Sequence, residues 1–371
     1  MNFSFDLATD QDDPALRRLL AANAMPGRIT VTFEREPNYF LGCRTMGRFC
    51  QVLVGRRPDG GVAAVLCRAT QPRFVNGQIR EIGYLGQLRV DGPFRGRWAL
   101  QQGLAALRSL HADGRASHYL VAISDENRIA RGVLVKHPRP SFPQMREIAH
   151  LHTLGIILRR PKATIRSPYT IERGSAGALT EIVAFVNRCG AQRQFFPVYS
   201  IRDFNAPAGL VRGFDVHDFI IARQKRRIVG VIGLWDQSAY KQTIVQSYSG
   251  ALRQIRPLYN LGARLFGAQP LPAPGEHIRS AYASFICIAG NGADHTDIFR
   301  ALLRRVYNLA ARRRYAHLML GLAEQDPLLP VAQEYAHITY TSRLYLACWR
   351  GDEKMLPPLD DRVPYIEIAA L

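Results

Sequence analysis

The sequence predicts an α/β protein in which one order of helices and strands occurs twice. The chain has 371 residues, enough for two domains of ordinary size. Hydrophobic residues make up 47% of the total, as in folded globular proteins. Each half shows a helix, a hairpin, a long strand, a loop, a second helix and further strands in the same order. This repetition favours duplication of one fold.

The first half is expected to form a domain over residues 1–160. A helix is expected over Asp12–Ala24, because an aspartate cap precedes a proline in the first turn. A hairpin follows, with its turn at Pro58–Gly61 between Val52–Val54 and Val62–Leu66. The remaining elements are a strand over Ile79–Val90, a loop over Asp91–Gly96, a helix carrying Leu100, Leu104 and Leu107 on one face, a strand over His118–Ile123, a helix over Asn127–Val135 and strands within Met145–Leu158.

The second half is expected to form a domain over residues 161–371, after a basic linker at Arg159–Tyr169 that has no periodicity. Ala239–Glu276 is expected to be an insertion broken up by prolines. The other expected elements are a helix over Ala176–Arg188, a hairpin of Asp218–Ala222 and Ile228–Leu234, a strand over Ile278–Ala289, a loop over Gly290–Asp294 with a helix after it, a strand over His317–Leu322, a helix over Leu328–Tyr335 and a strand over Ile338–Trp349.

The charge of the chain is strongly positive. Lys and Arg number 49 against 30 acidic residues, a net charge of +19 that attracts polyanions. The basic residues form only short clusters, such as Lys225–Arg227 and Arg312–Arg314, and these are not interleaved with aromatic residues as on an RNA-binding sheet. A high arginine content is also typical of GC-rich genomes. Nucleic-acid binding is therefore not favoured.

The sequence points to a cytoplasmic protein without a metal site. No stretch approaches the ~18 apolar residues of a membrane span, and the acidic segment Met1–Asp13 does not resemble a secretory signal. The six cysteines form no CxxC pair and are expected to be buried free thiols in a reducing compartment. His150 and His152 share one face of a strand, but two histidines alone do not make a metal site.

The segment Glu81–Leu100 carries the clearest chemical signal. A strand ends at Val90, a loop rich in glycine and arginine follows, and an amphipathic helix starts beside Arg97. Such a loop gathers backbone N–H groups at the positive end of a helix, where anions bind. Glycine allows close approach of the backbone, and arginine adds charge and forked donors. The pattern is that of a phosphate-binding loop, although a plain strand-to-helix turn has the same elements.

The same segment resembles the GNAT superfamily of acyl-CoA N-acyltransferases. The diagnostic stretch of that family reads Val-x-Pro-x-x-Arg-Gly-x-Gly-x-Gly/Ala, and Val90, Arg95 and Gly96 stand at its spacing. The proline is displaced by one position, and Trp98 and Leu100 replace two small residues. The resemblance spans about residues 5–160 and is fainter in the second half, where no Arg-Gly pair occurs. It implies two tandem GNAT-like domains, each with a mixed, largely antiparallel central sheet flanked by helices.

The resemblance also implies functions for individual residues. Acetyl-CoA or another acyl-CoA would be the donor substrate, with its pyrophosphate at the loop and helix over residues 91–100, and an amine would be the acceptor. The implied cofactor-binding residues are Leu88, Val90, Arg95, Gly96, Arg97, Trp98 and Asn127. Leu134 stands where many members have a tyrosine that protonates the thiolate. The candidate catalytic residues are Glu81 as base, Tyr84 as acid or water holder, and Tyr335 as an acid in the second half.

Two other functions remain open at this point. A degenerate pair of domains would bind CoA or an acyl ligand without catalysis, and Trp98, Leu100 and Leu134 favour it. A transferase that uses aminoacyl-tRNA would account for the basic surface. A serine hydrolase is a poor fit, since G-x-S-x-G is absent, as are the Walker and dinucleotide motifs.

Overall fold

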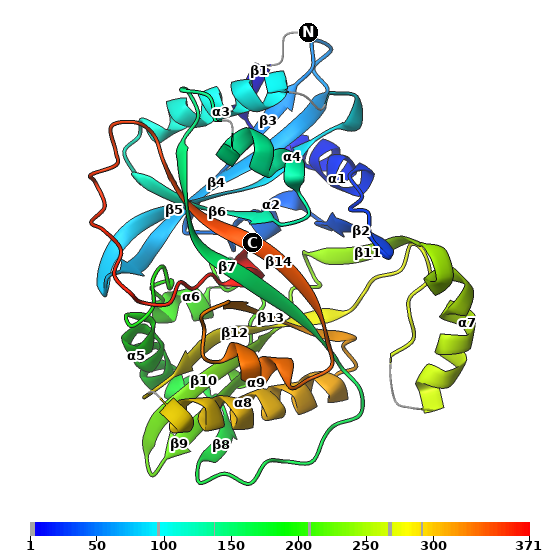
Figure 1. Ribbon diagram of the computed structural model, residues 1–371, viewed down its shortest axis with the longest axis vertical. Helices are drawn as coiled ribbons and strands as arrows, with labels where there is room; N and C mark the ends of the chain where they lie inside the picture. Colours follow the sequence, from blue (N-terminus) through cyan, green and yellow to red (C-terminus); the bar gives the residue numbers. More distant parts are fainter. Residues whose placement is uncertain (1–3, 95–96, 137, 207–208, 266–268, 291) are drawn as a thin grey trace.

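The chain forms one continuous sheet that passes through both halves. A computed structural model describes residues 4–94, 97–136, 138–206, 209–265, 269–290 and 292–371. Within them, 12 strands lie in the order β1-β3-β4-β5-β6-β14-β7-β13-β12-β10-β9-β8 (Figure 1). Most neighbouring strands are antiparallel, and the pairs β5–β6 and β12–β13 are parallel. The predicted fold class, a mixed and largely antiparallel sheet with flanking helices, is confirmed.

The first half contains the elements that the sequence predicted, with longer strands. The hairpin of β3 and β4 is followed by β5, and β7 is one continuous strand. The bounds are β1 Ser4–Leu7, α1 Asp13–Ala22, β2 Ile29–Glu34, α2 Tyr39–Cys43, β3 Phe49–Arg56, β4 Val62–Val75, β5 Gln78–Val90, α3 Arg97–His111, β6 His118–Ser124, α4 Arg128–Arg131, a π-helical turn at Gly132–Lys136 and β7 Gln144–Ile157.

The second half repeats this order. The bounds are β8 Thr170–Arg173, α5 Leu179–Gly190, α6 Ile201–Asn205, β9 Phe219–Gln224, β10 Arg227–Trp235, β11 Gln242–Tyr248, α7 Gly250–Leu265, β12 Ser280–Ile288, α8 Gly292–Arg312, β13 His317–Ala323, α9 Leu329–Gln333 and β14 His337–Cys348. The insertion is more regular than its prolines suggest, because β11 pairs with β2 and α7 accommodates Pro257. Figure 1 shows α7 projecting from the side of the molecule.

The two halves exchange their last strands. β14 belongs to the second half in sequence, yet it lies between β6 and β7 and pairs with both. β7 in turn pairs with β13 of the second half over seven residue pairs, from His317–Ile157 to Ala323–Leu151. The halves therefore share a hydrogen-bonded centre, although the predicted sequence boundary near residue 160 stays a prediction.

Helices cover both faces of the sheet. On one face, α3 packs over β3 to β6 through Leu104 and Leu107, and α8 packs over β12 and β13 through Leu302 and Val306. On the other face, α1 and α2 cover the first half, and α5 and α6 cover the second. The buried apolar side chains of these helices recur every three or four residues, which is why the sequence pattern predicted them. The helices on the two faces therefore hold the carboxyl ends of β5, β6, β12 and β13 between them.

Two further predictions concern membrane-spanning helices and the cysteines. Among the described residues no helix is both long and apolar enough to cross a membrane. The six cysteines are free, and four of them are buried, namely Cys43, Cys67, Cys287 and Cys348. The expectation of buried thiols holds for these four, while Cys50 and Cys189 are half-buried.

Candidate active site

The parallel strands β5 and β6 part shortly after they meet. Their ladder covers only Gly83–Tyr119 and Tyr84–Leu120, although β5 continues to Val90 and β6 to Ser124. Beyond Tyr84, β5 therefore has a strand partner on the β4 side but none on the β6 side within the described residues. We call this opening between the ends of β5 and β6 the first wedge. Along its β5 edge, the strand has no parallel partner among the described residues after Tyr84.

A β-bulge lies at the start of the first wedge. Val65 pairs with Arg89 and Cys67 with Gly86, so that Gln87 and Leu88 together oppose a single residue of β4. Gln87 has a φ of 59°, in the left-handed region that a residue with a side chain rarely adopts. Bulges re-aim the groups next to them and are common beside active sites. Here the bulge turns the edge of β5 away from β6 where the ladder ends.

Helix α3 points its amino end at the same region, since it begins at Arg97, seven residues after β5 ends. Its first turn contains no acidic residue, so the positive end of the helix is not neutralised by its own side chains. Arg95 and Gly96 lie outside the described residues, as do the side chains of Arg97 and Trp98. The predicted pyrophosphate contacts therefore stay a prediction.

Tyr84 is the predicted catalytic residue that the fold brings to the bulge. Its side chain is 6% exposed and lies on the face covered by α1 and α2. A Cβ added to Gly86 would lie 2.9 Å from the Tyr84 hydroxyl, so the ring extends along β5 over this glycine. Burial raises the pKa of Tyr84 to about 12, and the nearby Arg89 only partly opposes this. At neutral pH the hydroxyl keeps its proton and can donate it.

Three other predicted donor-binding residues, Leu88, Val90 and Asn127, lie in the described part of the chain. Leu88 is 37% exposed within the bulge, and Val90 pairs with Ala64 at the end of β5. Asn127 follows β6 and caps α4, with its side-chain oxygen accepting from Ala130 N over 3.0 Å. Capping already occupies this oxygen. The function of Asn127 that the structure displays is to hold α4 beside the mouth of the wedge.

Two predicted catalytic residues lie elsewhere. Glu81 is exposed near the start of β5, six residues before Gln87, which is about 20 Å along an extended strand. Direct proton transfer at the bulge is out of its reach. Tyr335 is 4% exposed in the core between α8 and α9, where its hydroxyl accepts from Arg304 Nε over 3.0 Å. Tyr335 is thus packed in the core of the second half, and its function as an acid there stays a prediction.

The second half contains the same opening, and the chain itself fills it. β12 and β13 pair in parallel only from Ser280–His317 to Tyr282–Met319, and a bulge follows at Phe285, whose φ is 56°. We call the opening beyond Tyr282 the second wedge. The segment Tyr365–Leu371 lies against it, and a Cβ on Gly321 of β13 would clash with Ile368. Tyr84, Gln87 and β6 thus correspond to Tyr282, Phe285 and β13.

Glu367 lies in the second wedge and contacts the bulge. Its carboxylate accepts from Phe285 N over 3.0 Å and from the Tyr365 hydroxyl over 2.7 Å. The residue is 2% exposed, and burial raises the pKa of its carboxyl. The backbone donor of this bulge is therefore satisfied within the chain, and Asp294 in the first turn of α8 further disfavours an anion there. Sequence reasoning missed Glu367, because the segment around it has no periodic pattern.

No protein-family model and no curated protein matches the sequence. Solved structures do have a similar fold. N-myristoyltransferase from Saccharomyces cerevisiae with bound myristoyl-CoA has a TM-score of 0.63 at 9% identity, over 93% of this chain and 82% of that chain. A GCN5-related N-acetyltransferase from Sphaerobacter thermophilus has a TM-score of 0.57 at 13% identity, over 96% and 97%.

A third similar structure is part of a larger protein. The GCN5-related glucosamine N-acetyltransferase region of a fungal multi-domain GH3 β-N-acetylglucosaminidase has a TM-score of 0.58 at 15% identity. The match covers 93% of this chain and 38% of that chain. Together these similarities show that the chain has the GNAT fold in a tandem two-domain arrangement. At such low identity they show the fold alone, so the chemistry has to be argued from the site.

Proposed function

We propose that the protein is an acyl-CoA-dependent N-acyltransferase that moves an acetyl or longer acyl group to an amine, with the donor bound in the first wedge. The observation that carries this proposal is the contrast between the wedges. Within the described residues β6 pairs with the bulged strand β5 only at Gly83 and Tyr84, whereas Glu367 and Ile368 lie at the matching position beside β12 and β13. One of the neighbouring folds was solved with myristoyl-CoA bound, which supports an acyl-CoA as the ligand class.

The donor would enter between α3 and α4. Its pyrophosphate fits the amino end of α3, where the helix dipole and the loop over residues 91–96 favour negative charge. The pantetheine arm would then run along the β5 edge and place the thioester at the bulge. An extended polyamide chain suits this edge, because β6 pairs with β5 only at Gly83 and Tyr84 within the described residues.

The chemistry would take place at Gln87 and Leu88. The amine attacks the thioester carbonyl, and backbone N–H groups of β5 stabilise the oxyanion that forms. When the tetrahedral intermediate collapses, the departing thiolate takes a proton. Tyr84 is suited to donate it, since its hydroxyl lies at the bulge and the pKa of about 12 keeps it protonated.

Thermal unfolding with CoA, acetyl-CoA and a long-chain acyl-CoA tests the proposal. A ligand at about 100 times its Kd adds about 2.7 kcal/mol of stability, a shift that is easily measured. We expect stabilisation by a thioester, its loss in Arg95→Ala, and its retention in Arg226→Ala, a matched control at an exposed arginine of the second half.

An assay of thiol release distinguishes the transferase from the other candidate functions. Release of free thiol in the presence of an amine panel supports the transferase. If thioesters stabilise the protein but no amine of the panel causes release of free thiol, the protein is a non-catalytic pair of domains that binds acyl-CoA. If no thioester stabilises the protein, the proposal fails, and stabilisation by aminoacyl-tRNA would instead favour the transferase that uses the basic surface.

A further inference from the structure

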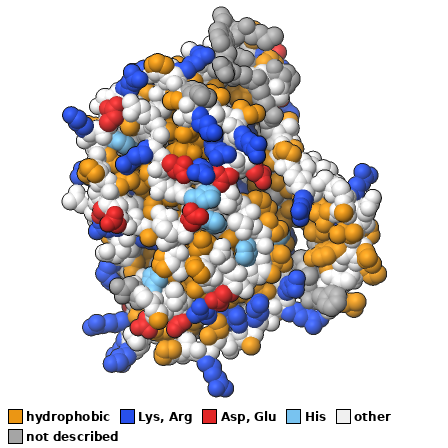
Figure 2. Space-filling view, viewed as in Figure 1, with side chains coloured by type: hydrophobic (Ala, Val, Ile, Leu, Met, Phe, Trp, Pro, Cys, Tyr) orange, Lys and Arg blue, Asp and Glu red, His pale blue; other side chains and the backbone are white. Residues whose placement is uncertain are grey.

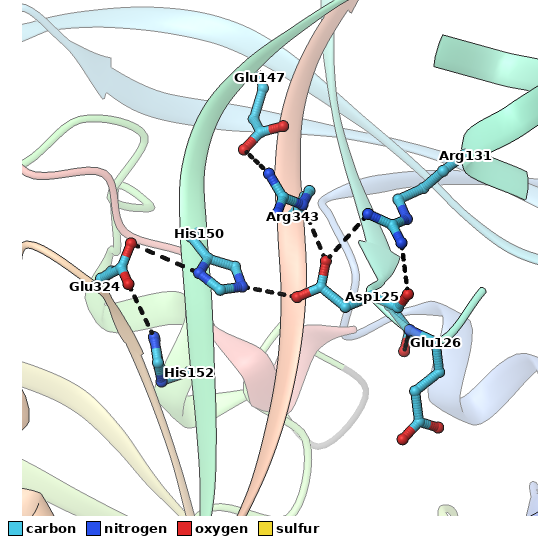
Figure 3. A network of polar contacts seen from close by, with 9 residues as sticks. Asp125, Glu126, Arg131, Glu147, His150, His152, Glu324 and Arg343 are labelled. Carbon is cyan, nitrogen blue, oxygen red and sulfur yellow. Dashed lines mark hydrogen bonds and ion pairs between the residues drawn. The ribbon is translucent and has the colours of Figure 1, made fainter. Parts of the chain in front are cut away.

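Three side chains that the acyl-transfer proposal does not use converge at the centre of the sheet. His150 and His152 lie on one face of β7, the face covered by α3 and α8, and Glu324 follows the end of β13 beside them (Figure 3). Glu324 N donates to His150 O over 2.8 Å, which fixes the register of the two strands at this point. The ligand atoms of the three residues all lie within 4.8 Å of one another.

The hydrogen bonds of His150 determine which of its ring nitrogens is free. Nε2 lies 2.7 Å from Asp125 Oδ2, and a carboxylate only accepts, so Nε2 carries the proton of this bond. In the neutral imidazole Nδ1 then keeps its lone pair, and it points toward Glu324 Oε2 at 3.6 Å. Asp125 is itself held by Arg343 Nε at 3.0 Å and by Arg131, from β14 and α4 (Figure 3). Asp125 thus fixes the orientation of the His150 imidazole at Nε2, on the side of the ring opposite Glu324.

His152 completes the set. Both of its ring nitrogens are buried atoms without a hydrogen-bond partner among the residues that the structure describes, and Nε2 lies 3.9 Å from Glu324 Oε1. Buried polar atoms are normally paired, so an unpaired imidazole beside a carboxylate requires a partner from outside the chain. A cation between the ring nitrogens of His150 and His152 and the carboxylate of Glu324 would supply such a partner.

We propose that His150 Nδ1, His152 Nε2 and a Glu324 carboxylate oxygen bind a divalent transition-metal ion, with Zn²⁺ the best match. Bonds of about 2.0–2.2 Å in a tetrahedral zinc site place neighbouring ligand atoms about 3.3–3.5 Å apart. The three ligand atoms lie within 4.8 Å of one another, and the separations of 3.6 and 3.9 Å run to different oxygens of Glu324, so the side chains would have to move together around the ion. Two histidines and one glutamate are also the protein ligands of known zinc sites that keep a fourth position for water.

The surroundings fit such a site. A histidine that binds a metal usually donates its other N–H to a carboxylate, as His150 does to Asp125. The site is open to solvent, since the Glu324 side chain is 64% exposed, and Figure 2 shows histidine side chains at the surface beside acidic ones. The fourth position would face water. The ion would also link the two halves, because both histidines come from the first and the glutamate from the second.

Metal binding to the untagged, full-length protein tests this proposal without any assay of activity. The protein is dialysed against a chelator, then titrated with Zn²⁺ by calorimetry, and with Co²⁺ as an absorption probe of tetrahedral geometry. We expect one ion per chain. His152→Gln and Glu324→Gln should each weaken the affinity at least 100-fold, and Asp125→Asn should weaken it about 10–100-fold through the orientation of His150.

The controls decide the outcome. Glu324 is exposed, so Glu324→Gln does not endanger folding, and its circular dichroism should match that of the wild type. His217→Gln removes an exposed histidine elsewhere and should leave the affinity unchanged. If wild type binds no Zn²⁺ at 1:1 stoichiometry, or if Glu324→Gln and His217→Gln bind it equally well, the site does not exist.

Discussion

The first and second wedges are two versions of one structure. In both, parallel pairing ends at a tyrosine, Tyr84 or Tyr282, and a bulge with positive φ follows three residues later. They differ in what meets the bulge. Phe285 donates its N–H to the buried Glu367 of the same chain, whereas Gln87 is half-buried beside an opening. One copy of the opening is thus filled by the chain itself, and we propose the other as the donor site.

This difference shows why a repeated fold does not imply a repeated function. The ring of Phe285 is fully buried and stacks on Trp235 at 5.7 Å between ring centroids. The second bulge therefore stabilises the domain through burial. Among the described residues no aromatic stacking of this kind is found at Gln87, whose φ of 59° is also strained. Strained backbone is typical of functional sites.

The largest expected effect comes from the two tyrosines. Tyr84→Phe should lower kcat at least 100-fold, because general acid catalysis typically contributes about 10²–10⁴-fold. Tyr282→Phe, at the matching position of the filled wedge, should leave kcat unchanged. Steady-state kinetics with the best thioester and amine checks both variants, and the affinity for the donor should stay the same. Equal activity of Tyr84→Phe and wild type would remove Tyr84 from the mechanism.

The bulge residues should differ in their effect on stability. Phe285→Gly removes a buried ring and should cost about 3 kcal/mol, even though glycine accepts the positive φ. Gln87→Gly should change the free energy of unfolding by no more than about 1 kcal/mol, since relief of the strained φ offsets the added freedom of the unfolded chain. Urea unfolding measures both. A similar cost at the two positions would mean that the first bulge is packed like the second.

The smallest effect concerns the dependence of stability on pH. Burial raises the pKa of Glu367 above its ordinary value of 4.5 in the folded protein. Its contribution to stability is therefore fully present below pH 4.5 and decreases as the pH rises through the folded pKa. The stability of wild type relative to Glu367→Gln should fall as the pH is raised from 4.5 toward neutral. A constant difference across this range would contradict a buried carboxyl with a raised pKa.

The sequence predicted the elements with strong local patterns and missed those that depend on distant contacts. Strand β5 and helix α3 were predicted because their periodicity is long, and Tyr84 was predicted because it lies on that strand. The exchange of β7 and β14 could not be predicted, because the order of strands in a sheet is set by packing and gives no local pattern in the sequence. Glu367 follows no motif, and Gln87 gives no signal because positive φ usually calls for glycine. Glu324 joins His150 and His152 only through the pairing of β13 with β7.

Hydrogen–deuterium exchange with and without acetyl-CoA tests the central claim most directly, because it reports on the two wedges in one experiment. The donor should slow exchange in peptides that cover Leu85–Leu100 and leave those that cover Ala283–Ala293 unchanged. That result would place the ligand at the first bulge alone. Slower exchange at the second wedge would contradict the assignment of the donor site to the first half. Unchanged exchange at both wedges, with a thioester that is known to bind, would contradict it as well.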